Sequence, residues 1–188
     1  MEQGWSPICD AGEADADEWG VLKTSSVSSG VFDVSANKRL PSTVDPELRW
    51  QVMEGDLLMV RGSGSRSAVG AVAVAKPGRH LLTISDLLYR IRGLKGSPAF
   101  HAAALRSPQV RQVIEGAFRT DAGQTLKLRS ADVLDLPHPS VPVEQMDSAL
   151  AQLAAVAGPS RELVKTLETQ IALLRERRQA LITAAVTG

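Results

Sequence analysis

The segment Arg61–Ser67, with the sequence RGSGSRS, is the densest group of residue types that could bind a nucleic acid. It offers two guanidiniums, three hydroxyls, and two glycines that let the main chain approach a ligand closely. A guanidinium can donate two parallel hydrogen bonds to a guanine edge, which discriminates against other bases by about 1–3 kcal/mol. The alternative interpretation is a hairpin loop whose arginines are solvated.

Motifs for catalysis or cofactor binding are incomplete. The stretch GSGSRSAVG lacks the Gly-Lys-Ser/Thr ending of a phosphate-binding loop, and Asp135–Pro139 (DLPHP) lacks the aromatic residue of an amino-methyltransferase motif. His80, His101 and His138 do not have the spacing of zinc ligands, and Cys9 is the one cysteine. We therefore predict no catalytic residue, no metal site and no cofactor bound by this chain.

The net charge of zero conceals an uneven distribution. Residues 1–20 hold six acidic side chains and no Lys or Arg, whereas residues 21–140 hold 16 basic and 10 acidic ones. Residues 141–188 hold five of each. The positive excess in the middle of the chain favours a polyanionic partner.

The sequence favours a reducing compartment. One cysteine excludes an internal disulfide. The first 20 residues are acidic where a signal peptide is basic, and no apolar run approaches 18 residues. We expect a cytoplasmic protein.

The elements that must position these residues are short strands followed by helices. From Trp19 onward, apolar residues alternate with small polar ones around a Ser-Ser-Gly turn, which predicts short strands with a turn between them. Further strands are expected at Leu57–Arg61, Val69–Ala75 and Leu87–Arg92. Helices are predicted at 100–105 and 109–118, with a return to loop and strand over 120–137. The fold class is therefore α+β, a globular domain of mostly antiparallel strands over residues 1–136.

A proline-rich linker, residues 137–143, separates this domain from a helical segment, residues 144–188. Apolar residues there recur at alternating spacings of four and three, which predicts a coiled coil. Gly158-Pro159 should kink this helix or split it in two. The alternative to a paired rod is a helix that folds back on its own domain.

Several motifs together resemble those of one family. They are GWSPIC (4–9), EWGVLKTSSVSSGVF (18–32), NKRLP (37–41), EGDLLMVR (54–61), VGAVAVA (69–75), LLYRIR (87–92), FHAAALRSPQVRQVIEG (100–116), SADVLDLPHPSVPVEQ (130–145) and LLRERRQALITAAVTG (173–188). In this order they resemble the specificity subunit of type I restriction–modification enzymes, in a form with one target-recognition domain and one spacer helix. Two features depart from the family: Arg61-Gly62-Ser63 replaces an Arg-Ala-Asn type sequence, and members with two recognition domains and two helices are longer.

The resemblance implies a non-catalytic subunit that recognises one half of a bipartite DNA site. It implies docking to methyltransferase subunits, which supply S-adenosylmethionine and catalysis, and to a restriction subunit that carries the nuclease. Family spacer helices pack antiparallel, so a chain with one helix would pair with a second copy. The alternatives are a coiled-coil protein–protein interaction module and an inactive fragment of a longer specificity subunit.

With the resemblance, the candidate residues fall into two sets. Those expected to contact DNA are Lys23, Ser25, Lys38, Arg39, Arg61, Ser63, Ser65, Arg66, Tyr89, Arg90, Arg119, Gln124, Thr125, Lys127 and Arg129. Those expected at the dimer or methyltransferase interface are Leu150, Leu153, Val164, Leu167, Ile171, Leu174, Arg178 and Leu181.

Overall fold

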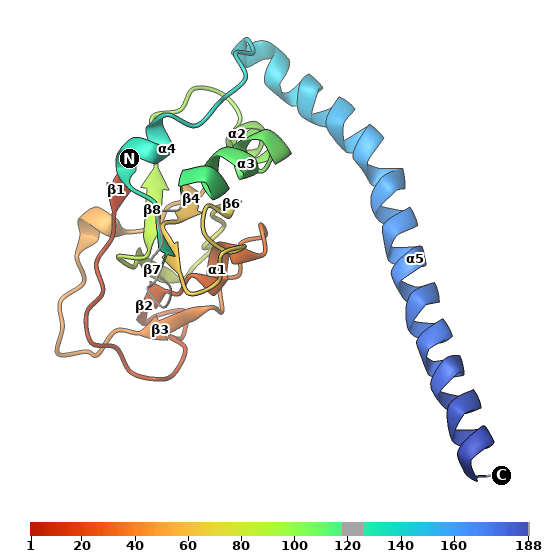
Figure 1. Ribbon diagram of the computed structural model, residues 1–188. Coiled ribbons are helices and arrows are strands. Elements are labelled where there is room, and N and C mark those ends of the chain that lie inside the picture. Colours follow the sequence, from red (N-terminus) through yellow and green to blue (C-terminus); the bar gives the residue numbers. More distant parts are fainter. Residues whose placement is uncertain (118–125, 188) are drawn as a thin grey trace. The chain divides into compact units, whose positions relative to one another are not determined.

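The computed structural model describes residues 1–117 and 126–187, without the side chains of 157–165 and 184–187. Two units make up the chain, Met1–Met146 and Asp147–Gly188 (Figure 1). The first is an α+β domain, and the second is part of one long helix.

The first unit contains three small sheets. The four-stranded sheet has the order β1-β8-β4-β6, formed by β1 (Glu2–Gln3), β8 (Leu88–Ile91), β4 (Leu57–Val60) and β6 (Val72–Val74), and its neighbouring strands are all antiparallel. The three-stranded sheet has the order β3-β2-β7, formed by β3 (Asn37–Arg39), β2 (Trp19–Leu22) and β7 (Leu81–Ile84). The third sheet pairs β5 (Gly62–Ser63) with β9 (Leu126–Lys127). Only the β2–β7 pair is parallel among the described strands, so the predicted α+β class with mostly antiparallel strands is confirmed.

The β4 strand lies between two hydrophobic cores. Because successive side chains of a strand point to opposite faces, Leu57 and Met59 enter one core, while Leu58 and Val60 enter the other. Burial on both faces explains why β4 reads as an unbroken apolar run, LLMV.

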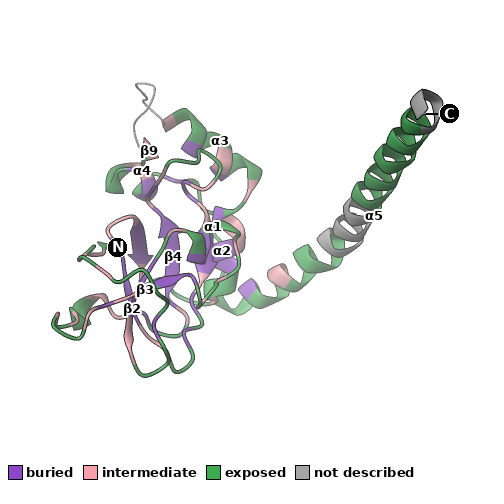
Figure 2. Ribbon diagram, turned by 90° about the horizontal axis from the view of Figure 1, so that it is seen from below, coloured by how far each residue is buried: buried purple, intermediate pink, exposed green. Residues whose placement is uncertain are grey.

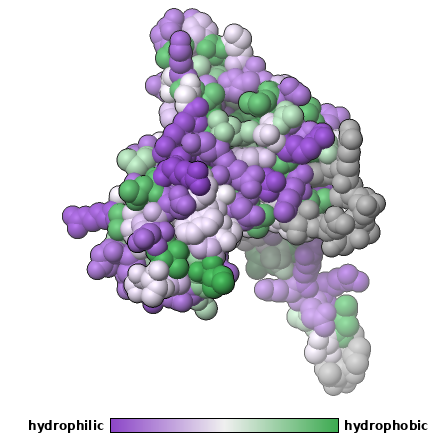
Figure 3. Space-filling view, turned by 90° about the vertical axis from the view of Figure 1, so that its left-hand side faces the viewer, coloured by the Kyte–Doolittle hydropathy of each residue, from purple (hydrophilic) through white to green (hydrophobic). Residues whose placement is uncertain are grey.

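Helices complete both cores. The first core includes residues of α2 (Pro98–Leu105), α3 (Pro108–Ala117) and α4 (Ser130–Leu134). The second includes Val27 of α1 (Ser25–Ser28), together with residues of β2 and β7. Figure 2 shows the buried residues gathered in the strands and on α2. On the face seen in Figure 3, hydrophilic side chains cover much of the surface and separate smaller hydrophobic patches.

Of the short strands predicted around the Ser-Ser-Gly turn, the one before it is present as β2, and the strand predicted after it is wrong. After β2 the chain forms α1, and β2 pairs with β3 and β7 instead. The Ser26 hydroxyl donates to the carbonyl of Lys23 at 2.7 Å, and Val27 is fully buried. A local bond from the serine side chain to the main chain, with one apolar anchor, thus favours a helical turn over an extended strand.

Two further predictions need correction. Ser130–Leu134 forms α4, where loop and strand were predicted; the Asp132 carboxylate caps its start by accepting from the Arg129 amide at 3.0 Å. A kink or a split was predicted at Gly158-Pro159, and the split is wrong, because α5 (Met146–Thr187) is one helix of 42 residues. The predicted helices are present as α2 and α3, each with proline in its first turn. Two single-turn 3₁₀ helices occur at Leu48–Trp50 and Val143–Gln145.

Candidate nucleic-acid interface

The segment Arg61–Ser67 leaves β4 and is held against two other parts of the chain. The amide of Arg61 donates to the carbonyl of Leu87 at 2.8 Å. Gly62 and Ser63 form β5, in which Gly62 faces Lys127 of β9. The structure therefore brings Lys127 beside the segment that holds Arg61 and Ser63, although these two segments are far apart in the sequence.

A hollow of about 440 Å³ lies beside this segment. Its lining includes Lys23, Ser25 and Lys38, which come from the end of β2, from α1 and from β3. Thr24, Ser6, Cys9, Ser85 and Leu87 also line it. Two ammonium groups and several hydroxyls around one concave surface are groups that bind phosphate oxygens.

The turn at Ser85–Leu87 joins the hollow to the loop. Leu87 lines the hollow, and its carbonyl accepts from the main chain of Arg61. The Arg61 guanidinium also donates to the carbonyl of Asp86 at 3.4 Å. A strip of polar and basic residues thus runs from the hollow to β9. We call it the basic strip, with the members Lys23, Ser25, Lys38, Arg61, Ser63 and Lys127.

Ser65 and Arg66 lie beyond the basic strip in the same loop. The Ser65 amide donates to the Ser63 hydroxyl at 3.1 Å, and the Ser65 and Ser67 hydroxyls are 3.0 Å apart. The Arg66 guanidinium donates to the carbonyl of Glu115 in α3 at 3.2 Å. The loop is therefore ordered by internal bonds and by a contact with α3.

Acidic neighbours already neutralise two of the predicted arginines. The Arg39 guanidinium pairs with Glu18 at 2.8 Å. Arg129 pairs with Asp132 at 2.7 Å, and this hydrogen bond raises the pKa of Arg129. Both arginines lie at the surface, but a DNA phosphate would have to compete with a carboxylate for each.

Tyr89 and Arg90 do not face solvent. The Tyr89 hydroxyl donates to the carbonyl of Leu128 at 3.0 Å and accepts from Arg61 at 3.2 Å. Arg90 is 1% exposed, and its guanidinium donates to Glu2 and to the carbonyls of Gln51 and Arg49. Both side chains are buried and hydrogen-bonded within the domain, so we do not include them among the proposed DNA contacts. The other three predicted residues, Arg119, Gln124 and Thr125, lie outside the described residues.

Sequence reasoning missed two residues near this surface. Cys9 lines the hollow, and burial raises the pKa of its thiol. Arg111 of α3 binds the main chain of the loop by donating to the carbonyl of Val69 at 2.7 Å. Both residues lie in motifs quoted above, 4–9 and 100–116, but the spacing within a motif does not show which distant segments its residues contact.

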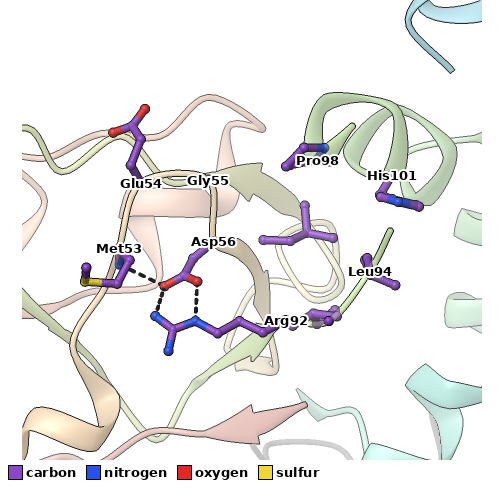
Figure 4. Close-up of a pocket in the computed structure, with 11 residues that line it drawn as sticks. Met53, Glu54, Gly55, Asp56, Arg92, Leu94, Pro98 and His101 are labelled. Atoms are coloured by element: carbon purple, nitrogen blue, oxygen red, sulfur yellow. Dashed lines mark hydrogen bonds and ion pairs between the residues drawn. The ribbon is translucent and has the colours of Figure 1, made fainter. Parts of the chain in front are cut away.

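A second hollow, of about 400 Å³, lies near the start of α2 (Figure 4). Asp56 points toward Arg92 there, and its carboxylate accepts from that guanidinium at 2.7 Å and from the Met53 amide at 2.8 Å. The same pairing raises the pKa of Arg92. These two bonds to Asp56 end on Oδ2, and Oδ1 accepts from Nε of Arg92. With both oxygens of Asp56 bonded, the hollow presents a structural ion pair.

The described residues offer neither a metal site nor a membrane-spanning helix. Nowhere in residues 1–117 and 126–187 do three or more His, Cys, Asp or Glu side chains gather so that they could hold a metal ion. Within the same residues, no helix combines the length and apolar character needed to cross a bilayer.

The apolar seam of α5 is exposed in the single chain. Leu150 is half-buried, Arg178 is exposed, and the side chain of Val164 is not described. Large exposed apolar residues of the seam are Leu153, Leu167, Ile171, Leu174 and Leu181. A row of this kind along a helix needs a partner surface to leave water.

Comparisons with known proteins point to one family. Over 91 residues the chain is 37% identical to the type I restriction enzyme EcoEI specificity subunit of Escherichia coli, an alignment that covers 48% of this chain and 15% of the relative. Over 173 residues it is 25% identical to the EcoKI specificity subunit of Escherichia coli strain K12, covering 89% of this chain and 36% of the relative. The chain is a homologue of type I restriction enzyme specificity subunits. It spans well under half the length of these two relatives.

Two solved structures of type I R-M proteins have a similar fold. The HsdS subunit of Thermoanaerobacter tengcongensis matches with a TM-score of 0.55 and 18% identity, over 83% of this chain and 41% of that one. A chain from a study of complex assembly and conformational transition in the type I R-M system matches with a TM-score of 0.57 and 17% identity, over 84% of this chain and 42% of that one. No family model matches the sequence.

Proposed function

We propose that this chain is the DNA-recognition subunit of a type I restriction–modification complex and reads one half of a bipartite site. The observation that carries this proposal is the basic strip. Four separate parts of the chain contribute to it, in a homologue of specificity subunits. Residues 1–136 would recognise DNA, residues 137–143 would link, and residues 144–188 would form the spacer.

The strip has the two kinds of group that such recognition needs. Lys23, Lys38 and Lys127 are exposed and can bind phosphates, which position a protein on DNA without reading its sequence. Arg61 and Ser63 belong to the same strip and would read base edges through a guanidinium and a hydroxyl. Arg61 is already oriented, because Tyr89 accepts a hydrogen bond from it at 3.2 Å.

The proposed subunit is non-catalytic and acts in the cytoplasm. Methyltransferase subunits would supply S-adenosylmethionine and the reactive groups, and a restriction subunit would supply the nuclease. Two copies of the chain would pair through α5, since its exposed seam is apolar over several turns. A two-fold pair would present two identical recognition domains and therefore read a palindromic bipartite site.

The test begins with the chain reconstituted with the methyltransferase subunits of its own system. Selection from a random DNA library should return a two-part motif. Cys9, the chain's one cysteine, lines the hollow, so its rate of alkylation measures whether the hollow is covered. The selected DNA should slow alkylation of Cys9, measured by peptide mass spectrometry, whereas DNA of scrambled sequence at the same concentration should slow it much less.

Two results together would contradict the proposed function. If no motif is selected and Cys9 reacts at the same rate with and without DNA, the strip is not a DNA surface. The coiled-coil interaction module would then be the better interpretation. Its partner would be a protein, and its binding would lack the steep salt dependence caused by counterion release from DNA.

A further inference from the structure

Arg111 of α3 holds the main chain of the loop that follows β5. Its guanidinium donates to the carbonyls of Val69 at 2.7 Å, Ser67 at 3.3 Å and Arg66 at 3.0 Å. Its Nε donates to Glu115, one turn along the same helix, at 2.8 Å. All three nitrogens of this side chain therefore donate within the protein.

The loop returns a contact to the same helix. Arg66 donates from its guanidinium to the carbonyl of Glu115 at 3.2 Å. Each partner thus supplies an arginine that binds the main chain of the other. We call Arg66, Arg111 and Glu115 the arginine clasp.

The clasp is fixed at its base by the hydrophobic core. Gly70 follows the clasped carbonyls with a φ of +81°, and a Cβ there would lie 2.5 Å from Cδ1 of Ile114. Ile114 is itself buried in the first core. Arg111 therefore projects from a helix that cannot shift easily, so the position of its guanidinium is set by packing.

A planar guanidinium suits this role for a physical reason. Its donors have a fixed geometry and can bind several carbonyls at once, whereas an ammonium is a point charge on a flexible stem. Ordering a glycine- and serine-rich loop costs conformational entropy, which weakens binding if the cost falls at the moment of association. A loop held in place beforehand avoids that loss.

We propose that Arg111 is a positioning residue for base recognition. By fixing the main chain of residues 66–69, it sets the direction in which Ser63, Ser65 and Arg61 face DNA. This inference rests on the proposed function. In this proposal Arg111 acts on recognition through the loop, by its bonds to the main-chain carbonyls.

The experiment compares Arg111→Ala and Arg111→Lys with the wild-type complex, using selected DNA and scrambled DNA over a series of salt concentrations. Gln112→Ala, an exposed neighbour on the same helix, is the matched control. Both Arg111 variants should lose roughly 10- to 100-fold in affinity for selected DNA, the discrimination carried by one base contact. Affinity for scrambled DNA and the slope of log K against log salt should not change, because no phosphate contact is lost.

A second measurement separates this inference from the proposed function. Hydrogen exchange of amides 64–69 in the protein without DNA should be faster in both Arg111 variants and unchanged in Gln112→Ala. If the wild-type complex shows no sequence preference, the proposed function fails, while this exchange result still decides whether the clasp orders the loop.

Two outcomes would overturn the inference. One is unchanged exchange together with unchanged specific affinity in Arg111→Ala. The other is an equal loss for both DNAs with a salt slope reduced by about one, which is the signature of a phosphate contact. Glu115→Gln serves as a milder variant: it removes the charge paired with Arg111 but keeps the carbonyl contacts, and should give a smaller effect than Arg111→Ala.

Discussion

Arg90 and Glu2, 88 residues apart in the sequence, form an ion pair that joins β8 to β1. The arginine is almost fully buried, while the glutamate side chain is 50% exposed. Because Arg90 also donates to the carbonyls of Arg49 and Gln51, one guanidinium ties three segments together. A buried cation with several acceptors stabilises the fold, and removal of one acceptor lowers the free energy of unfolding.

Glu2→Gln should lower the free energy of unfolding by about 1–2 kcal/mol at pH 7. This is less than the 3–5 kcal/mol of a fully buried pair, because water screens the exposed glutamate. The hydrogen bond from Arg90 lowers the pKa of Glu2 below its ordinary value of 4.5. The contribution is therefore complete above that value and is lost as the pH falls through the lower, folded-state pKa. Urea unfolding at pH 7 and at about pH 3 measures both effects.

Glu13→Gln is the control for this prediction, because Glu13 is exposed and nearby in the sequence. It should leave the stability unchanged at pH 7. Equal stabilities of wild type and Glu2→Gln at pH 7 would contradict the prediction.

Gly70→Ala should destabilise the first unit by about 1–3 kcal/mol. The residue has a positive φ, and the added methyl group would overlap the buried side chain of Ile114. Gly64→Ala is the matched control in the same region, because no atom lies within 4 Å of its Cβ position. Thermal unfolding should therefore separate the two variants, with Gly64→Ala close to wild type; a similar melting temperature for both would count against the packing described at α3.

Lys38→Ala and Lys127→Ala should each weaken binding to selected and scrambled DNA alike. Each loses one phosphate contact, so the slope of log K against log salt should fall by about one. Lys76→Ala removes an exposed lysine outside the basic strip and should leave the slope unchanged. Fluorescence titrations of the reconstituted complex over a salt series decide the matter, and equal slopes for all three variants would exclude the strip as the phosphate-binding surface.

Ile171→Asp should prevent pairing of two copies through α5. Ile171 is an exposed apolar residue of the seam, and burying its side chain stabilises an interface by about 1.5–3 kcal/mol per chain. The dimer dissociation constant should rise at least about tenfold. Gln179→Asp places the same carboxylate at an exposed position outside the seam and should leave it unchanged. Sedimentation of the full chain measures both, and an unchanged dimer in Ile171→Asp would place any pairing elsewhere.

Deletion of residues 167–173 should shorten the gap between the two halves of the DNA site. Seven residues preserve the seam register and remove about 10 Å of helix. At about 3.4 Å per base pair, the gap should shrink by roughly three base pairs. Methylation mapping of DNA modified by the altered complex reads the gap directly. An unaltered gap would show that α5 does not set the spacing.

Local features of the chain could be predicted because local forces determine them. The apolar run of β4 and the prolines that start α2 and α3 identify these elements without knowledge of their neighbours. The seam of α5 follows from its spacing alone. In each case the residue types carry the information within a few positions.

Long-range pairing could not be predicted in the same way. Tyr89 and Arg90 point to opposite faces of β8, and the sequence predicted that both would be available to DNA. In the structure both faces of β8 are buried, and the alternation of residue types along the strand does not show this. Arg39 carries a charge that the acidic Glu18 neutralises only in the folded chain. The contact of Arg111 with three carbonyls depends on the path of a loop that is distant in the sequence. The spacing of residues along the sequence does not predict that path.

The clasp has a consequence for how such a protein can evolve. Arg111 donates its hydrogen bonds to main-chain carbonyls of the loop, and every residue type has a main-chain carbonyl. Substitutions at positions 63 and 65 can therefore alter what the loop displays while its anchorage persists. Under the proposed function, a new target sequence would require one or two replacements here, which remove the bonds among Ser63, Ser65 and Ser67 but keep those from Arg111.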